Sequence, residues 1–423
     1  MQRILNWIDD RFPLTALWKS QVSEYYAPKN FNFWYFMGSL ALVVLVMQLI
    51  TGIFLTMSYK PDATKAFESV EYIMRDVAGG WFIRYAHSTG ASAFFIVVYL
   101  HMFRALLYGS YRKPRELLWI VGCFIYLALM AEAFFGYLLP WGQMSYWGAQ
   151  VIVNLFSTVP IIGDDLGTWI RGDYTVSDVT LNRFFAFHVA AVPLVLLLLV
   201  VVHLMALHEV GSNNPDGVEI KDRKDPKTGH PIDGIPFHPY YTVKDLVGVV
   251  VFLAFFSIVL FFWPDGGGYF LEANNFVPAN PLQTPVHIAP VWYFTPFYAM
   301  LRAVPSYFNS QFWGVLVMGA AVVILFFMPW LDRSPVKSIR YRGPLYKGWL
   351  AAFVVSFLVL GYLGVVPVTV WGQFSEKVPL LGTADKATVV ARVLTIVYFL
   401  FFLLMPWYTA RDKTKPVPER VTG

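Results

Sequence analysis

Two pairs of histidines stand inside the most apolar stretches of this sequence. His87 and His101 are 14 residues apart, and His188 and His203 are 15 residues apart. Fourteen residues of α-helix span about 21 Å and return to within about 40° of the same face. Opposed imidazoles from two helices are how a bundle holds a bis-histidine haem. The spacing therefore predicts two haems at two depths, with ordinary hydrogen-bonded bundle histidines as the alternative.

Glycines repeat the 14-residue spacing in two further apolar segments. Gly38 and Gly52 lie in the first segment, and Gly122 and Gly136 lie in the third. Glycine is common wherever membrane helices pack closely, so each one alone says little. Together with the histidines they predict two layers that hold flat macrocycles. One layer contains Gly52, Gly136, His87 and His188, and the other contains Gly38, Gly122, His101 and His203.

The composition is that of a polytopic membrane protein. Of the 423 residues, 57% are hydrophobic and 14% are charged, and the mean hydropathy is +0.53. A soluble fold could not bury so much apolar surface. The single cysteine, Cys123, excludes intrachain disulfides and cysteine-ligated clusters. The sequence contains no phosphate-binding loop and no nucleic-acid-binding patch, so no nucleic-acid partner is expected.

Eight apolar segments are long enough to cross a membrane. They are residues 34–57, 81–106, 115–138, 180–206, 243–263, 309–331, 347–367 and 387–408. We therefore expect an all-α polytopic membrane protein with eight transmembrane helices, whose first four helices form a di-haem four-helix bundle. Both termini are expected on one side.

The chain divides into segments of distinct composition. These are an N-terminal interfacial helix region (1–33), the bundle (34–206), an inner loop (207–242), four C-terminal helices (243–408) and a charged tail (409–423). Lys and Arg gather in the connections on one side, which is therefore expected to be cytoplasmic. Two long connections lie on the opposite side, 139–179 and 264–308. Their length indicates function, and we expect short amphipathic helices in them.

Five motifs resemble a known family. They are G-Y-L-L-P-W-G-Q-M-S-Y-W-G-A (136–149), L-N-R-F-F-A-F-H (181–188), H-E-V-G-S-N-N-P (208–215), F-H-P-Y-Y-T-V-K-D (237–245) and P-V-W-Y (290–293). Over nearly its whole length the chain resembles cytochrome b of the ubiquinol–cytochrome c reductase complex. The resemblance implies two non-covalently bound b-type haems, ubiquinol as substrate, and a Rieske iron–sulfur protein and a c-type cytochrome as partners. It also implies a homodimer of complexes, and we expect a bacterial inner membrane.

The resemblance further implies a proton-translocating Q cycle. Quinol is oxidised near the outer face, one electron goes to the Rieske protein, and the other crosses two haems to reduce quinone near the inner face. His87 and His188 would bind the low-potential haem near the outer face. His101 and His203 would bind the high-potential haem near the inner face.

Two arginines flank the histidines of the second span. Arg84 stands three residues before His87, and Arg104 stands three residues after His101. They are expected to pair with haem propionates at the membrane edge. The alternative is that they are ordinary anchors that extend to the membrane surface.

Four polar residues near the inner surface are candidates for quinone reduction. They are His208, Ser212, Lys244 and Asp245. Reduction takes up two protons, which calls for a group that titrates near neutrality and a carboxylate that reloads it. His208 and Asp245 are the expected proton donors, and an ion pair that anchors two helix ends is the alternative.

Tyr137 and Tyr293 are candidates to line the quinol pocket at the outer face. The family motif has a glutamate after the proline of P-V-W-Y, often assigned as a proton acceptor, but this chain has Val291. Glu132 is the expected replacement, because an intramembrane carboxylate is costly and marks a functional site. The alternative is a structural hydrogen bond to helix backbone or to an arginine. His287 is expected to hydrogen-bond loop backbone.

The second histidine pair departs from the 14-residue spacing. A separation of 15 residues rotates His203 by about 60° from His188 in a regular helix. Pro193 lies between them. We therefore predict a kink or a one-residue bulge that restores both imidazoles to one face.

Two other functions fit the histidines. One is a di-haem membrane anchor that passes electrons from a peripheral dehydrogenase to quinone, and the other is a transporter with a histidine proton relay. The long outer connections and a quinone motif at each face favour the reductase, because an anchor needs only one quinone site.

Overall fold

Within the residues that the structure describes, eight helices are long and apolar enough to cross a membrane, as predicted. They span Phe33–Thr56, Gly80–Tyr108, Glu116–Leu138, Asp178–Val210, Phe237–Phe262, Phe312–Leu331, Pro344–Val365 and Lys386–Leu403. Each overlaps its predicted range. The structure is a computed structural model and describes residues 2–306, 310–373 and 385–422. The outermost residues of the predicted 1–33, 264–308, 309–331 and 409–423 segments lie outside this description.

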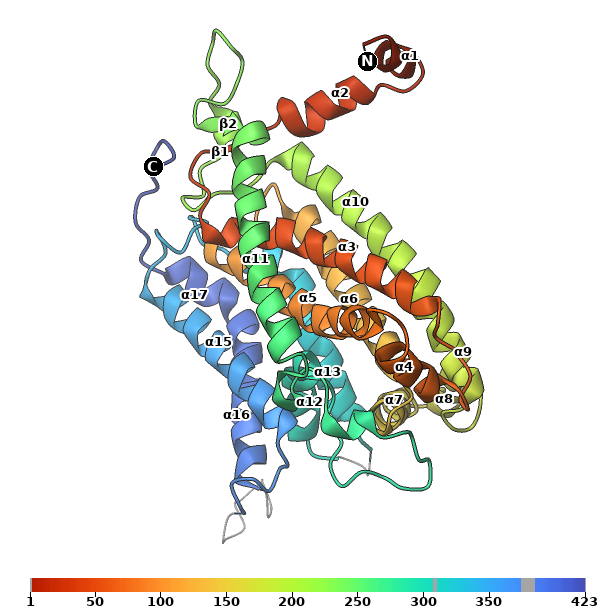
Figure 1. The fold of residues 1–423 in the computed structure, drawn as a ribbon. Helices are drawn as coiled ribbons and strands as arrows, with labels where there is room; N and C mark the ends of the chain where they lie inside the picture. The colour runs from red at the N-terminus through yellow and green to blue at the C-terminus, as the bar shows by residue number, and fades with distance from the viewer. Residues whose placement is uncertain (1, 307–309, 374–384, 423) are drawn as a thin grey trace.

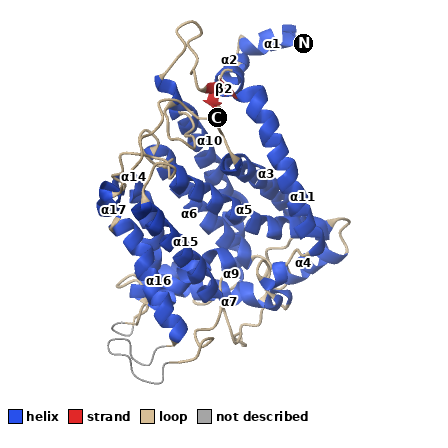
Figure 2. Cartoon of the chain, turned by 90° about the vertical axis from the view of Figure 1, so that its left-hand side faces the viewer, coloured by secondary structure: helices blue, strands red, loops and turns tan. Residues whose placement is uncertain are grey.

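The regular elements follow one another as α1 (Gln2–Asp9), α2 (Leu14–Trp18), β1 (Tyr26–Pro28), α3 (Phe36–Thr56), α4 (Ala66–Arg75), α5 (Gly80–Tyr108), α6 (Glu116–Leu138), α7 (Gln143–Phe156), α8 (Gly163–Arg171), α9 (Asp178–Ala186), α10 (Val192–Val210), β2 (Gly234–Pro236), α11 (Thr242–Phe262), α12 (Thr295–Ala303), α13 (Phe312–Val323), α14 (Met328–Leu331), α15 (Pro344–Val365), α16 (Lys386–Leu403) and α17 (Met405–Arg411). Helices make up nearly all of the regular structure (Figure 2).

The first four spans form the predicted bundle. Helix α3 packs against α5, and α6 packs against α10 (Figure 1). The four C-terminal spans do not form one matching group, because α11 packs against α3 and α5. Gly248 of α11 faces the ring of Phe36, and a Cβ there would lie 2.8 Å from that ring. The missing side chain lets α11 approach the bundle, while α12, α13, α15 and α16 pack together.

The two chain ends lie at the same end of the molecule (Figure 1). The predicted N-terminal interfacial region contains two short helices, α1 and α2, with a break before Pro13. Proline disfavours helical geometry in the residue before it, which accounts for the break. The small antiparallel sheet in which Tyr26 pairs with Pro236 was not predicted. Both outer connections contain short helices, with α7 and α8 in 139–179 and α12 in 264–308.

The fourth span contains the predicted irregularity. Residues Phe187–Ala191 form a π-helical turn between α9 and α10, directly before Pro193. A π turn accommodates one extra residue, so the 15-residue separation behaves as 14 would in a regular helix. The bulge keeps His188 and His203 on one face of the span, toward α5.

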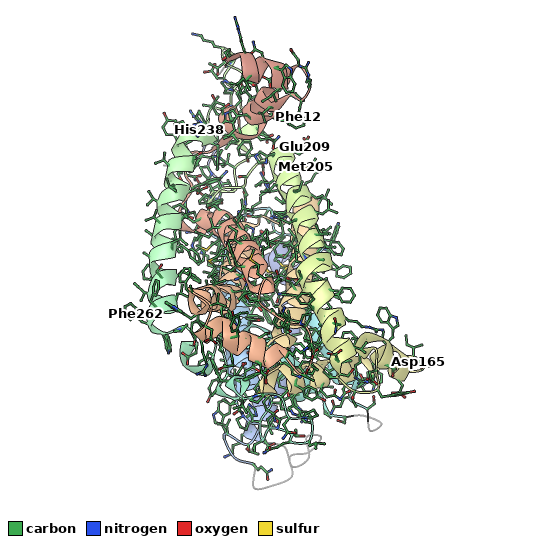
Figure 3. All side chains as sticks on the ribbon, turned by 45° about the vertical axis from the view of Figure 1, so that its right-hand side comes forward. Phe12, Asp165, Met205, Glu209, His238 and Phe262 are labelled. Carbon is green, nitrogen blue, oxygen red and sulfur yellow. The ribbon has the colours of Figure 1, made fainter. Side chains whose placement is uncertain are left out.

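The opposite face of α10 is apolar and uncovered. Leu194, Leu198 and Met205 each have about two-thirds of their surface exposed, and Met205 points away from the bundle in Figure 3. Such a face suits lipid. Asp165 lies at the other end of the molecule from Glu209 and His238 (Figure 3), so the acidic and basic connections are at opposite ends.

Candidate functional site

The four bundle histidines form two opposed pairs. The ring centroids of His87 and His188 are 6.0 Å apart, and those of His101 and His203 are 6.4 Å apart. A metal–imidazole bond is about 2 Å long and the ring centroid lies about 1 Å further, so one metal between two imidazoles separates their centroids by about 6 Å. Both pairs therefore match the separation that a shared metal requires.

Each predicted glycine lies beside the histidine of its own layer. A Cβ on the glycine would lie close to an imidazole atom in each case: 3.4 Å for Gly38 and His101, 3.2 Å for Gly52 and His87, 3.3 Å for Gly122 and His203, and 2.4 Å for Gly136 and His188. The glycines and histidines assigned to each layer thus lie next to one another. The glycines make room for the imidazole rings, a closer role than the spacing indicated.

In the outer histidine pair, the Nδ1 atom of each ring contacts a polar group. Nδ1 of His87 lies 2.9 Å from Oγ1 of Thr51. Nδ1 of His188 lies 3.0 Å from the carbonyl oxygen of Glu132 and 3.0 Å from its carboxylate Oε1. Such partners fix ring orientation and raise the basicity of a metal ligand. The sequence did not predict the contact of Thr51 with His87. Among the described residues, the Glu132 carboxylate contacts His188 and neither helix backbone nor an arginine.

The inner pair has a different environment. The Nη2 atom of Arg104 lies 3.4 Å from Nδ1 of His101, and its guanidinium lies over the ring of Tyr35. Among the described residues, Nδ1 of His203 and Nε of Arg104 are buried without a hydrogen-bond partner. A buried cation with a free donor fits a carboxylate such as a haem propionate. Arg84 borders the cavity at the outer pair.

A cavity of about 250 Å³ extends from the outer histidine pair to the outer connection. Its wall includes the three outer-site candidates Glu132, Tyr137 and Tyr293, together with Val291. The Tyr293 ring stacks on Phe95 at 3.8 Å between centroids, and burial raises the pKa of its phenol. The cavity is apolar with a few convergent polar groups, which suits a small-molecule site.

A second carboxylate reaches the outer site from the 264–308 connection. The Tyr137 hydroxyl donates a hydrogen bond to Oε2 of Glu272 at 2.7 Å. Glu272 was not predicted, because only the folded loop brings it to Tyr137. His287 Nε2 lies 2.6 Å from the carbonyl oxygen of Val365, a backbone partner as expected.

At the inner end, His208 and Ser212 contact the N-terminal segment. Nδ1 of His208 lies 2.8 Å from the Leu204 carbonyl oxygen, and Nε2 lies 3.1 Å from the Gln21 carbonyl oxygen. Both neighbours are backbone carbonyl oxygens, which accept hydrogen bonds. The Ser212 hydroxyl is 3.1 Å from the hydroxyl of Tyr25.

The other two inner candidates lie in the first turn of α11. Nζ of Lys244 donates to the Phe31 carbonyl at 2.8 Å, and the Asp245 carboxylate faces Ser39. Within the ranges that the structure describes, no hydrogen bond or ion pair joins His208 to Asp245. The ion pair between two helix ends, which was the alternative role for these residues, is therefore not formed between His208 and Asp245 in the described residues.

An apolar four-helix bundle with opposed imidazole pairs is the architecture of haem-binding membrane proteins as a class. A family model described as cytochrome b/b6/petB matches residues 22–211, and one described as cytochrome b(C-terminal)/b6/petD matches residues 278–399. The chain belongs to the cytochrome b/b6 family.

Proteins named as cytochromes b match this chain over nearly its whole length. A cytochrome b of Allochromatium vinosum is 64% identical and covers 99% of this chain and 98% of that relative. A protein named cytochrome b/c1 from Bradyrhizobium diazoefficiens is 44% identical over 99% of this chain and 56% of its own length. Among solved structures, a chain of a hyperthermophilic respiratory Complex III has a TM-score of 0.83 and 38% identity, covering 96% of this chain and 99% of that one.

Proposed function

We propose that this chain is the haem-bearing catalytic subunit of a bacterial quinol–cytochrome c oxidoreductase. The single observation that carries the proposal is the pair of imidazole layers, 6.0 and 6.4 Å between ring centroids, inside one membrane bundle. The family and the likeness to a Complex III chain support the same function.

The histidines would hold two b-type haems, His87 with His188 and His101 with His203. When bound, the haems supply one-electron redox chemistry at two depths, so that an electron from quinol at the outer face can reach quinone at the inner face. The imidazoles fix the two depths. Arg104, with its unpaired buried donor, would neutralise a propionate of the inner haem, and Arg84 would do so at the outer haem.

The outer cavity would bind ubiquinol. Its apolar wall excludes water from the ring, and the Tyr137 and Tyr293 hydroxyls are the polar groups available to orient the quinol. The other quinol electron would pass to a Rieske iron–sulfur partner and then to a c-type cytochrome, which completes the Q cycle. The fused name of the cytochrome b/c1 relative supports a c-type partner.

The inner end would reduce quinone and take up protons. The ring nitrogens of His208 contact two carbonyl oxygens; His208 would donate a proton to the quinone, and Asp245 would reload it. Ser212 and Lys244 would help to position the quinone headgroup. Protons taken up inside and released outside give translocation.

The apolar spans and the bacterial relatives support a multi-pass protein of a bacterial inner membrane. Both termini would be cytoplasmic, because they lie at the end that carries the basic connections. Two copies of the complex would form the functional homodimer.

Reduction of cytochrome c by an added ubiquinol analogue tests this function. The purified complex should transfer electrons from the analogue to cytochrome c, and His188→Ala should abolish that transfer while its partner subunits remain bound. Haems that are reduced by quinol while cytochrome c stays oxidised would instead indicate a di-haem anchor.

A further inference from the structure

Glu272 presents a carboxylate to the outer cavity through a tyrosine. Its Oε2 accepts a hydrogen bond of 2.7 Å from the hydroxyl of Tyr137. Tyr137 itself lines the cavity, as do Leu271 and Asn275 on either side of Glu272. A proton that leaves a molecule in the cavity therefore has a hydrogen-bonded route through Tyr137 to a carboxylate.

The loop that carries Glu272 is fixed in place. The carbonyl of Glu272 accepts from the backbone N–H of Asn275 at 2.9 Å. The buried side chain of Asn275 accepts from the backbone N–H of Ser145 at 2.9 Å. A bridge between Gly142 and Pro278 ties the loop to the start of α7. The hydrogen bond to Tyr137 thus belongs to an ordered loop.

The charge environment favours proton uptake by this carboxylate. Burial raises the pKa of Glu272 above its ordinary value, and the hydrogen bond from Tyr137 offsets part of that rise. The titratable groups that face Glu272 in the described residues are the phenols of Tyr137 and Tyr293. No lysine or arginine among the described residues contributes to the pKa shift of Glu272. An acceptor whose pKa moves toward the working pH is the more effective base.

The other groups at the outer site are less suited to accept a proton. Val291 carries no acidic group. The pKa of the Tyr293 phenol is raised by burial, so it does not ionise near neutrality. Glu132 also lines the cavity, and its Oε2 is buried without a hydrogen-bond partner among the described residues, but its Oε1 lies 3.0 Å from Nδ1 of His188, which the proposed function assigns to the outer haem. Glu272 is the carboxylate that contacts a cavity-lining hydroxyl.

We propose that Glu272 accepts a quinol proton at the outer site, relayed by Tyr137, in place of an acid at position 291. This step rests on the quinol oxidation proposed above. The quinol O–H bond breaks as its proton passes to the Tyr137 oxygen, and the former Tyr137 proton passes to Oε2 of Glu272. The electron leaves the quinol for the one-electron iron–sulfur acceptor. Tyr137 is unchanged, and Glu272 becomes a neutral acid that later loses its proton to the outer aqueous phase.

The test is the pH profile of quinol–cytochrome c turnover in the intact complex carrying Glu272→Gln. Turnover should fall by about 10²-fold, with KM for quinol nearly unchanged. In the wild type, turnover should decline at low pH as the acceptor becomes protonated, and this acidic limb should disappear in the variant. Glu68→Gln, a change of an exposed glutamate in α4, should leave rate and profile as in the wild type.

Two further variants separate a chemical role from a structural one. Glu272→Asp should recover part of the rate and keep an acidic limb. Tyr137→Phe should lose a similar factor, and adding Glu272→Gln should cost little more, because both act in one relay. An unchanged rate and limb in Glu272→Gln would overturn the relay, as would disappearance of the limb in Glu132→Gln alone. A wild-type complex without quinol–cytochrome c activity would refute the proposed function instead.

Discussion

Replacing Gly136 by alanine should disrupt the outer haem site selectively. A Cβ at this position would lie 2.4 Å from Cε1 and 2.8 Å from Nδ1 of His188, whereas ordinary contact begins at 3.4 Å. The ring must therefore retreat by about 1 Å, half the length of a metal–nitrogen bond of about 2 Å. That displacement also breaks the contacts of Nδ1 with Glu132.

The fold should survive this change. Overpacking costs about 1–3 kcal/mol, and alanine regains about 1 kcal/mol in a helix interior. Haem binding should suffer more, because loss of ligand orientation typically reduces metal affinity by about 10–100-fold. The assay is haem content and a redox titration of the purified complex, together with its Tm.

Two glycine variants calibrate this result. Gly38→Ala brings a Cβ only to 3.4 Å from His101 and should retain the inner haem. Gly319→Ala adds a methyl to open space in α13 and should retain both haems. Full occupancy and an unchanged outer midpoint potential in Gly136→Ala would refute the close approach to His188. Loss of the inner haem alone would refute the assignment of layers.

Three further predictions concern buried charges. Glu132→Gln should raise the midpoint potential of the outer haem and leave that of the inner haem unchanged. The rise should be about 59 mV for each tenfold change in the relative affinity of the site for the two iron oxidation states. Equal shifts at both haems would contradict this prediction. Asp332→Asn leaves the buried Arg342 without its counter-charge and should cost about 3–5 kcal/mol, seen as a lowered Tm, whereas an unchanged Tm would be contrary evidence. Burial alone would raise the pKa of Asp332, but Arg342 and Arg112 outweigh it and hold it below its ordinary value. Its stabilisation is therefore present above about pH 4 and is lost as the pH falls through the lower folded pKa, so acid should lower the Tm of the wild type more than that of Asp332→Asn.

Regular helical periodicity made the bundle predictable. The spacing of His87 and His101 and of the glycine pairs translates directly into depth and direction along a helix. The 15-residue separation of His188 and His203 indicated a bulge because a regular helix would point one ligand away. The π turn at Phe187–Ala191 confirms that inference.

Contacts made by loops were not predictable in the same way. Glu272 reaches Tyr137 only because the outer connection folds back on α7, and nothing in its local sequence specifies that partner. The hydroxyl of Thr51 reaches His87 from a neighbouring helix, which depends on helix rotation. The close approach of α11 to α3 likewise includes a glycine contact, Gly248 on Phe36, that no local pattern indicated.

Optical redox titration of the purified complex in the haem α-band region tests the two haem layers most directly. We expect two b-type transitions with separate midpoint potentials, of which His87→Ala removes the low-potential one and His101→Ala removes the high-potential one. A single transition, no haem absorption, or loss of both haems in each folded variant would contradict two independent bis-histidine sites.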